Sequence, residues 1–346
     1  MSTNSNSKKW KDSLLKSSLP LELLVAEALH KNDFYVCGEY DYIRPNENGV
    51  NTEFSTDLWA FKFFQKDDIN SLVLNLLIEC KYNYPGVKWI FTPHINEEDI
   101  FIGLISVFQE FCTRRINDDI LFELDENLDY CYKGVELHTD NFNPQSISRG
   151  LNQLRYAIPY EVKKHYSSQI YCRNEDDLNI DMLCPILVTT SDLYIIKKGL
   201  NLDNFIAADS LDDIAYKVDS LVCYQESGVH LEDHINTISK EFYQQHPEIE
   251  KRLEVFSKIL SDEKFKKYRT ASSKFSIDNI FKDSTARILI ITFEAFEKCL
   301  KEIINIVSEA NKTIIKIADL NFVREQSPDI FERTNELLKS FQLPKK

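Results

Sequence analysis

The chain has 346 residues, of which 43% are hydrophobic and 12% aromatic, so it can bury a large core in one large or two ordinary domains. No apolar run reaches the roughly 18 to 20 residues that a membrane span needs, and the polar N-terminus lacks the apolar segment of a secretory signal. We therefore expect a cytoplasmic protein with no membrane partner. The net charge of −14 argues against coating nucleic acid through bulk electrostatics but leaves local binding open.

The cysteines give little sign of a metal site or a disulfide framework. Eight are present, none in a CxxC pair, and most stand in apolar surroundings. This pattern favours reduced thiols in a core over disulfides or a zinc site.

The first ordered element predicted is a helix that follows a flexible N-terminus, residues 1–18. Ser18 is placed to cap this helix, Pro20 suits its first turn, and Asn32 with Asp33 closes it. Its apolar face predicts a helix lying on a sheet and consists of Leu21, Leu24, Val25, Ala28 and Leu29.

Three strands are predicted next, at residues 34–43, 53–64 and 72–82. Their connections are too short for crossovers, so we expect an antiparallel meander. Alternation along the strands places Glu79 and Lys81 on one face, which Asp57 of the neighbouring strand can share.

The remainder of the chain is predicted as alternating strands and helices. In order, we expect a strand at 89–93, an apolar segment of ambiguous period at 100–111, a helix at 146–166 that Pro159 should kink or interrupt, one buried strand at 185–196, a strand at 218–224, mostly helix at 230–283, a strand turning into a helix at 286–307, and a last helix at 328–341. These elements predict a core over 19–225 and a mostly helical part over 226–346, whose strand 287–292 returns to the sheet.

An acidic residue stands two positions before a lysine at three places: Glu79–Lys81, Glu161–Lys163 and Asp262–Lys264. The first pair alone ends an apolar strand and has an aspartate, Asp57, on the preceding strand. Two carboxylates with a backbone carbonyl suit Mg²⁺ or Mn²⁺, and a nearby ammonium can orient a water molecule. We therefore predict metal-assisted phosphodiester hydrolysis, with Asp57, Glu79 and the Cys80 carbonyl as metal ligands and Lys81 on the water side.

These residues resemble the PD-(D/E)xK nuclease superfamily. The run EFSTD (53–57) followed by LLIECK (76–81) is similar to its motif, and residues 21–36 are similar to the first helix and strand of Holliday-junction resolvases and related restriction nucleases. The resemblance implies an α/β protein with a restriction-endonuclease-like mixed sheet flanked by helices, and a Mg²⁺-dependent DNA endonuclease in which Glu22 joins the active site. Thr56 departs from the proline that often precedes the family's aspartate.

The family often carries a glutamine on the helix after the third strand, and Gln153 is the candidate here. Four further residues share its helical spacing: Arg149, Tyr156, Tyr160 and Lys163. This stripe can contact a nucleic-acid backbone, or it can be a partly buried amphipathic face.

Alternative interpretations stay open at several residues. Asp57, Glu79 and Lys81 can be a charge pair on a solvated face, Glu27 competes with Glu22 for the helical position, and Glu39 can face the site or solvent. His230 and His234 lie four residues apart, but Leu231 replaces the glutamate of a HExxH metalloprotease.

The leading hypothesis is therefore a DNA endonuclease, acting as a homodimer or with a partner subunit bound through the C-terminal helices. Fold analogy suggests prokaryotic defence or DNA processing. The alternatives are a catalytically silent nuclease fold that serves as a nucleic-acid-binding or protein-interaction scaffold, and a nuclease acting on RNA or a branched junction.

Overall fold

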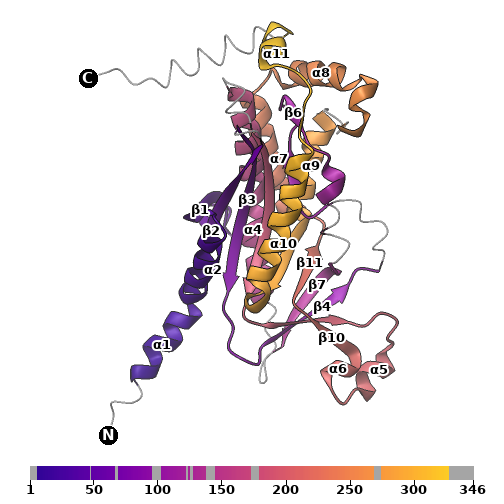
Figure 1. Ribbon diagram of the computed structural model, residues 1–346. Helices are drawn as coiled ribbons and strands as arrows, with labels where there is room; N and C mark the ends of the chain where they lie inside the picture. The colour runs from indigo at the N-terminus through magenta and orange to yellow at the C-terminus, as the bar shows by residue number, and fades with distance from the viewer. Residues whose placement is uncertain are drawn as a thin grey trace, which may run out of the picture.

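A computed structural model describes residues 6–46, 48–66, 69–95, 103–121, 124, 128–137, 145–172, 179–268 and 274–326. Over these residues, an α/β arrangement places helices on both faces of one large mixed sheet of 11 strands (Figure 1). Ten strands follow one another in the order β1-β2-β3-β8-β12-β11-β7-β4-β9-β10, and β5 pairs with β8. A second sheet pairs β6 with β13.

The strands have the following bounds: β1 (Tyr35–Pro45), β2 (Asn51–Lys66), β3 (Ile69–Lys81), β4 (Lys88–Pro93), β5 (Ser106–Phe108), β6 (Arg114–Arg115), β7 (Tyr130–Leu137), β8 (Ile180–Thr189), β9 (Asp192–Ile196), β10 (Ala215–Val218), β11 (Ser220–Tyr224), β12 (Arg287–Thr292) and β13 (Ile315–Lys316). The helices are α1 (Asn6–Lys16), α2 (Leu19–Lys31), α4 (Gln145–Tyr171), α5 (Leu202–Ala207), α6 (Leu211–Ile214), α7 (Val229–Gln245), α8 (Ile249–Leu260), α9 (Lys274–Ala286), α10 (Phe293–Lys312) and α11 (Leu320–Gln326), with 3-10 turns at Asp118–Leu121 and Glu263–Tyr268.

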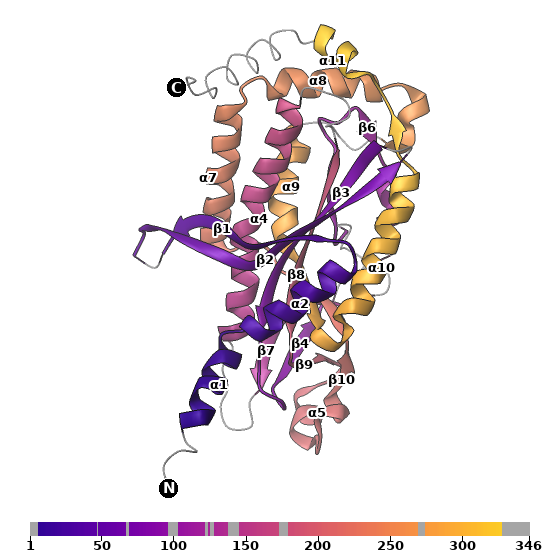
Figure 2. The same ribbon diagram turned by 60° about the vertical axis from the view of Figure 1, so that its left-hand side comes forward.

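Alternating side chains of the strands divide the core into two halves. On β3, Leu76 and Ile78 pack with α2 and α10, whereas Leu77 packs with α4 and its neighbours α7, α8 and α9. Figure 2 shows α4, α7 and α9 together on one side of the sheet, with α2 and α10 on the other. Successive side chains of a strand point to opposite faces, and here both sets are buried. Helices therefore cover the central strands on both faces of the sheet.

The predicted meander is confirmed. β1 pairs antiparallel with β2, and β2 pairs antiparallel with β3. β3 then pairs in parallel with β8, and β8 with β12, so the sheet is mixed. The strand β12 leads directly into α10, as the sequence pattern of 286–307 predicts.

The structure differs from two expectations about the middle of the chain. We expected Pro159 to kink or interrupt its helix; it does not interrupt α4, because Ile158 and Val162 beside it are fully buried and packing outweighs the local cost of proline. Residues 185–196 form parts of two strands, β8 and β9, instead of one. The chain turns between them where the Thr189 hydroxyl donates to the Lys81 carbonyl at 3.1 Å.

Smaller differences concern the helices. Ser18 precedes α2, but its side chain makes no capping hydrogen bond, and Leu24 of the expected apolar face is 45% exposed. The predicted helix at 328–341 lies outside the described residues. Among the described residues, no helix is long and apolar enough to cross a membrane.

Candidate functional site

The predicted acidic residues lie where two neighbouring strands separate. The ladder between β2 and β3 extends from Lys66 opposite Ile69 to Leu58 opposite Ile78. Asp57 is the next residue of β2, and from there β2 continues in its pairing with β1. Glu79, the next residue of β3, continues the parallel pairing with β8. The two carboxylates therefore lie at the point where β2 and β3 stop pairing with each other.

Asp57 is held by the backbone of the adjacent strand. Its Oδ2 accepts a hydrogen bond of 2.6 Å from the amide of Cys80, whose own side chain is fully buried. Burial raises the pKa of Asp57, and the bond from Cys80 and the charge of Lys81 partly oppose this effect.

Glu79 has no exposed area, and its two carboxylate oxygens differ in their surroundings. Oε1 accepts a hydrogen bond from the Lys81 ammonium, whereas Oε2 is buried and has no hydrogen-bond partner. Burial, reinforced by the charge of Asp57, raises the pKa of Glu79 to about 8 although Lys81 lowers it. A buried carboxylate oxygen without a partner is costly unless another group binds there.

Gln153 connects the lysine with the departing strand. Its Oε1 accepts from Lys81 Nζ at 3.1 Å, and its Nε2 donates to the Ser55 carbonyl of β2 at 3.2 Å. Gly150, one turn earlier on α4, lets the helix approach this closely, since a Cβ there would lie 2.8 Å from Leu187 and 3.3 Å from the Lys81 side chain. Sequence reasoning did not select Gly150, although a glycine inside a predicted helix was the available signal.

The N-terminal helix brings a third carboxylate to the cluster. Burial, then the charges of Asp57 and Glu39, raises the pKa of Glu22 to about 7, and Lys81 lowers it. Glu22 is half-buried, whereas Glu27 and Glu39 are exposed. The start of α2 is fixed by Ser18, whose hydroxyl accepts from the amide of Tyr82, just beyond Lys81, at 3.1 Å.

The rest of the predicted stripe on α4 does not face this cluster. Tyr156 lies beside Arg44 of β1, with 4.5 Å between the guanidinium and the ring centroid. Lys163 forms an ion pair of 3.0 Å with Glu241 of α7, and Arg149 is exposed at the start of α4. Within the predicted stripe, Gln153 bonds to Lys81, whereas Tyr156, Tyr160 and Lys163 contact β1 or α7.

A second buried charged group, not predicted from the sequence, lies farther along α4. His165 is within 3.0 Å of Glu161 and 3.4 Å of Asp181 on β8. Although burial lowers the pKa of His165, the charge and hydrogen bonds of Asp181 and Glu161 raise it to about 9. Burial likewise opposes ionisation of Glu161, but hydrogen bonding to His165 and the charges of His165 and Lys164 lower its pKa to about 2.

The side chains where β2 and β3 separate offer oxygen donors for a metal ion. Within the described parts of the chain, no group of three or more His, Cys, Asp or Glu side chains is arranged to hold one. Asp57 and Glu79 supply two carboxylates, which are hard oxygen donors of the kind that Mg²⁺ prefers, and Glu79 Oε2 has no other partner. These residues therefore fit a divalent ion whose remaining ligands are water, backbone or substrate oxygens.

No family model, curated protein or solved structure matches this chain. The fold and the candidate site are therefore described from the structure alone. The chain is an α/β protein with helices flanking a mixed sheet, and carboxylates, a lysine and a glutamine converge where β2 leaves β3.

Proposed function

We propose that this chain is a metal-dependent endonuclease of the restriction-endonuclease-like fold, which hydrolyses DNA phosphodiester bonds with Mg²⁺, or Mn²⁺ in its place. The observation that carries the proposal is the linked set of Asp57, Glu79, Lys81 and Gln153 at the point of strand separation. Asp57 on β2, Glu79 with Lys81 on β3, and Gln153 on α4 follow one another in the order that the family resemblance implies.

The roles of the side chains follow from their positions. Asp57 and Glu79, with the Cys80 carbonyl, would hold the metal ion, and Glu22 lies close enough to change the charge of the cluster. A divalent ion bound there polarises a phosphoryl oxygen and lowers the pKa of a coordinated water molecule. Lys81, held by Gln153, supplies a positive charge that orients the attacking water and offsets the negative charge of the transition state.

The test is cleavage of supercoiled plasmid and of single-stranded DNA with Mg²⁺, Mn²⁺ or EDTA. We expect cutting that requires the metal and is lost in Glu79→Ala and Lys81→Ala. The chain offers a matched control, because Asp262 and Lys264 repeat the same spacing as an exposed ion pair of 3.1 Å. Asp262→Ala and Lys264→Ala should cut like the wild type. Equal cutting by all four folded variants would contradict the proposal.

One observation favours the alternative of a catalytically silent module. Lys81 bonds directly to Glu79, so one carboxylate oxygen already has a partner without an added ion. Titration with Mn²⁺ in a calorimeter separates the two functions. A nuclease should bind the ion through Asp57 and Glu79, whereas a silent module should release no binding heat that depends on these residues.

We also infer that paired cuts on two strands use two copies of the chain or a partner subunit, joined through the C-terminal helices. Light scattering after size-exclusion chromatography, with and without DNA, tests this inference. A complex containing one copy of the chain and no other subunit, with plasmid linearised in a single event, would contradict it. Prokaryotic defence or DNA processing remains the context suggested by fold analogy.

A further inference from the structure

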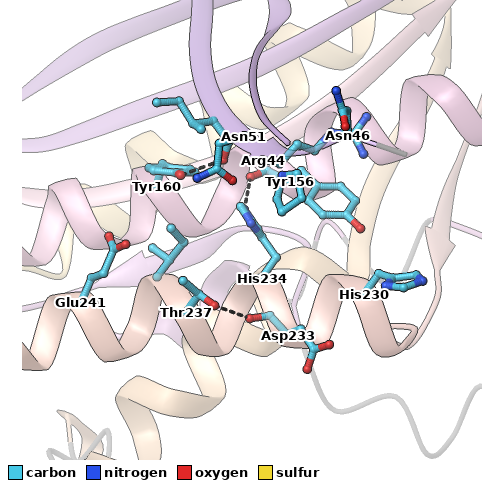
Figure 3. Close-up of a pocket in the computed structure, with 13 residues that line it drawn as sticks. Arg44, Asn46, Asn51, Tyr156, Tyr160, His230, Asp233, His234, Thr237 and Glu241 are labelled. Carbon is cyan, nitrogen blue, oxygen red and sulfur yellow. Dashed lines mark hydrogen bonds between the residues drawn. The ribbon is translucent and has the colours of Figure 1, made fainter. Parts of the chain in front are cut away.

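A pocket of about 540 Å³ lies next to the site, between the end of the β1–β2 hairpin and the helices α4 and α7. Figure 3 shows Arg44 and Asn51 on the hairpin side and His230, His234 and Glu241 along α7. The volume lies within the range of about 300 to 1,000 Å³ that small-molecule sites occupy. The hairpin is fixed over the pocket by the Tyr160 hydroxyl, which donates to the Ile43 carbonyl at 2.7 Å.

Arg44 provides a positive charge without an acidic partner among the described residues. Its guanidinium lies between two rings, 4.1 Å from the centroid of Phe54 and 4.5 Å from that of Tyr156. Its Nε is buried and has no hydrogen-bond partner. Stacking holds the guanidinium in place without a carboxylate neutralising it, and a guanidinium of this kind can bind a phosphate.

The opposite wall supplies flat rings and hydrogen-bond acceptors. The ring of His234 lies 5.0 Å from that of Tyr156 and 5.7 Å from that of Tyr160, and a His234 ring nitrogen lies 3.1 Å from the Tyr156 carbonyl. Burial lowers the pKa of His234, so its ring is uncharged at neutral pH. Asp233 also lines the pocket, although Figure 3 shows its carboxylate directed away from the rings.

These features together select one class of ligand. A simple anion would use Arg44 but would leave the rings without a partner. A nucleotide uses both, since its phosphate meets the guanidinium and its base stacks on the rings.

The pocket and the carboxylate cluster share helix α4. Tyr156 follows Gln153 by three residues, which is about 5 Å along a helix axis. Tyr42 of β1 lies near both the pocket and the carboxylate cluster, since its buried hydroxyl feels the charge of Arg44 from the pocket and that of Glu79 from the cluster. A strand whose phosphate reaches Lys81 can therefore place a neighbouring nucleotide at Tyr156.

We propose that this pocket receives one unpaired nucleotide of the nucleic-acid substrate, with its phosphate at Arg44 and its base against Tyr160 and His234. The inference rests on the proposed nuclease function and deepens it, because it assigns a single-stranded or locally opened substrate.

The experiment measures binding of a fluorescein-labelled single-stranded 16-nucleotide DNA in EDTA by anisotropy, so that cleavage plays no part. We expect Arg44→Gln to weaken binding about tenfold and to reduce the salt dependence by about one phosphate contact. Thr237→Phe fills the pocket from α7 and should weaken binding similarly. Its control is Asn236→Phe, which adds the same ring at an exposed neighbour outside the pocket.

The outcomes separate this inference from the proposed function. Loss of binding in both pocket variants supports the pocket whether or not the wild type cuts DNA. Wild-type affinity in folded Arg44→Gln and Thr237→Phe overturns it, even if the chain proves to be a nuclease. If blunt duplex DNA binds as tightly as the single strand and loses the same affinity in the two pocket variants, the assignment of an unpaired nucleotide is also overturned. Saturable binding of AMP at the affinity of the single strand would make this a free-nucleotide site and overturn the substrate assignment.

Discussion

Gln153 and Lys81 are joined by a hydrogen bond of 3.1 Å across 72 residues of sequence, and the same glutamine also bonds to Ser55. One side chain thus fixes the lysine relative to the strand that carries Asp57. We expect Gln153→Ala to lower the kcat of cleavage about tenfold to a hundredfold with little change in KM, because a positioning contact to a reacting group is lost.

Asn152→Ala is the matched control for Gln153, since Asn152 is exposed on the same helix. Thermal melts should show that both variants stay folded. A Gln153→Ala protein with the wild-type kcat would show that Lys81 holds its position without the glutamine.

Gly150→Ala tests the close approach of α4 to the sheet. Helix propensity alone predicts a gain of about 1 kcal/mol in the free energy of unfolding. We expect a loss of about 1 to 3 kcal/mol instead, because the new methyl group meets the fully buried Leu187 side chain at 2.8 Å. Urea denaturation decides the sign, and a stabilised variant would show that the helix shifts without cost.

Glu79→Gln should separate stability from activity. The substitution replaces a fully buried carboxyl group whose Oε2 has no partner, so we expect the free energy of unfolding to rise by about 1 kcal/mol while cleavage is lost. Glu53→Gln, at an exposed position of β2, should change neither property. A drop in stability would mean that the ion pair with Lys81 outweighs the cost of burial.

The group around His165 predicts a pH dependence of stability. The pKa of His165 rises from 6.5 to about 9 on folding, so its contribution is complete below about pH 6.5 and is lost as the pH rises through about 9. We expect the free energy of unfolding to fall by at most about 3 kcal/mol over this interval. The pKa of Glu161 falls to about 2, so its own contribution is lost only in strong acid.

Urea denaturation at pH 6.5 and pH 9 measures this loss. His165→Gln should be less stable at the lower pH and should show a weaker dependence. His30→Gln, at an exposed residue of α2, is the control and should follow the wild type. An unchanged pH dependence in His165→Gln would assign the effect to other groups.

Ser18→Ala tests the attachment of α2 beside the site. The substitution leaves the half-buried Tyr82 amide, just beyond β3, without its hydrogen-bond acceptor. We expect the free energy of unfolding to fall by about 1 to 3 kcal/mol. Ser17→Ala, at the exposed neighbour, should cost less than 1 kcal/mol, and equal losses in both would contradict this role.

The sequence was sufficient for the local part of the fold. Short turns and strict alternation identify β1, β2 and β3, and therefore place Asp57 beside Glu79. The same reasoning failed where distant contacts decide the structure. The apolar run at 185–196 gives no sign of its division, because the turn depends on a hydrogen bond from Thr189 to Lys81, 108 positions away.

The pocket was also beyond sequence reasoning. Tyr156 and Lys163 have the spacing of a surface that binds a substrate, but their contacts depend on how α7 and the hairpin pack on α4. Helical periodicity states which side chains share a face and not which element covers that face. Gln153 was predicted through the family resemblance, which implies a glutamine on the helix after the third strand, and the structure places it in contact with Lys81.

The separation of β2 from β3 has a mechanical consequence. Beyond Leu58, toward Asn51, β2 is paired with β1 and no longer with β3, and the two strands form a hairpin whose far end carries Arg44. The Tyr160–Ile43 hydrogen bond holds that end against α4. Asp57 lies where the hairpin leaves the sheet, so the position of the hairpin and the direction of the Asp57 carboxylate depend on the same stretch of backbone. Occupancy of the pocket and the geometry of the site would then change together, without any part of the central sheet having to shift.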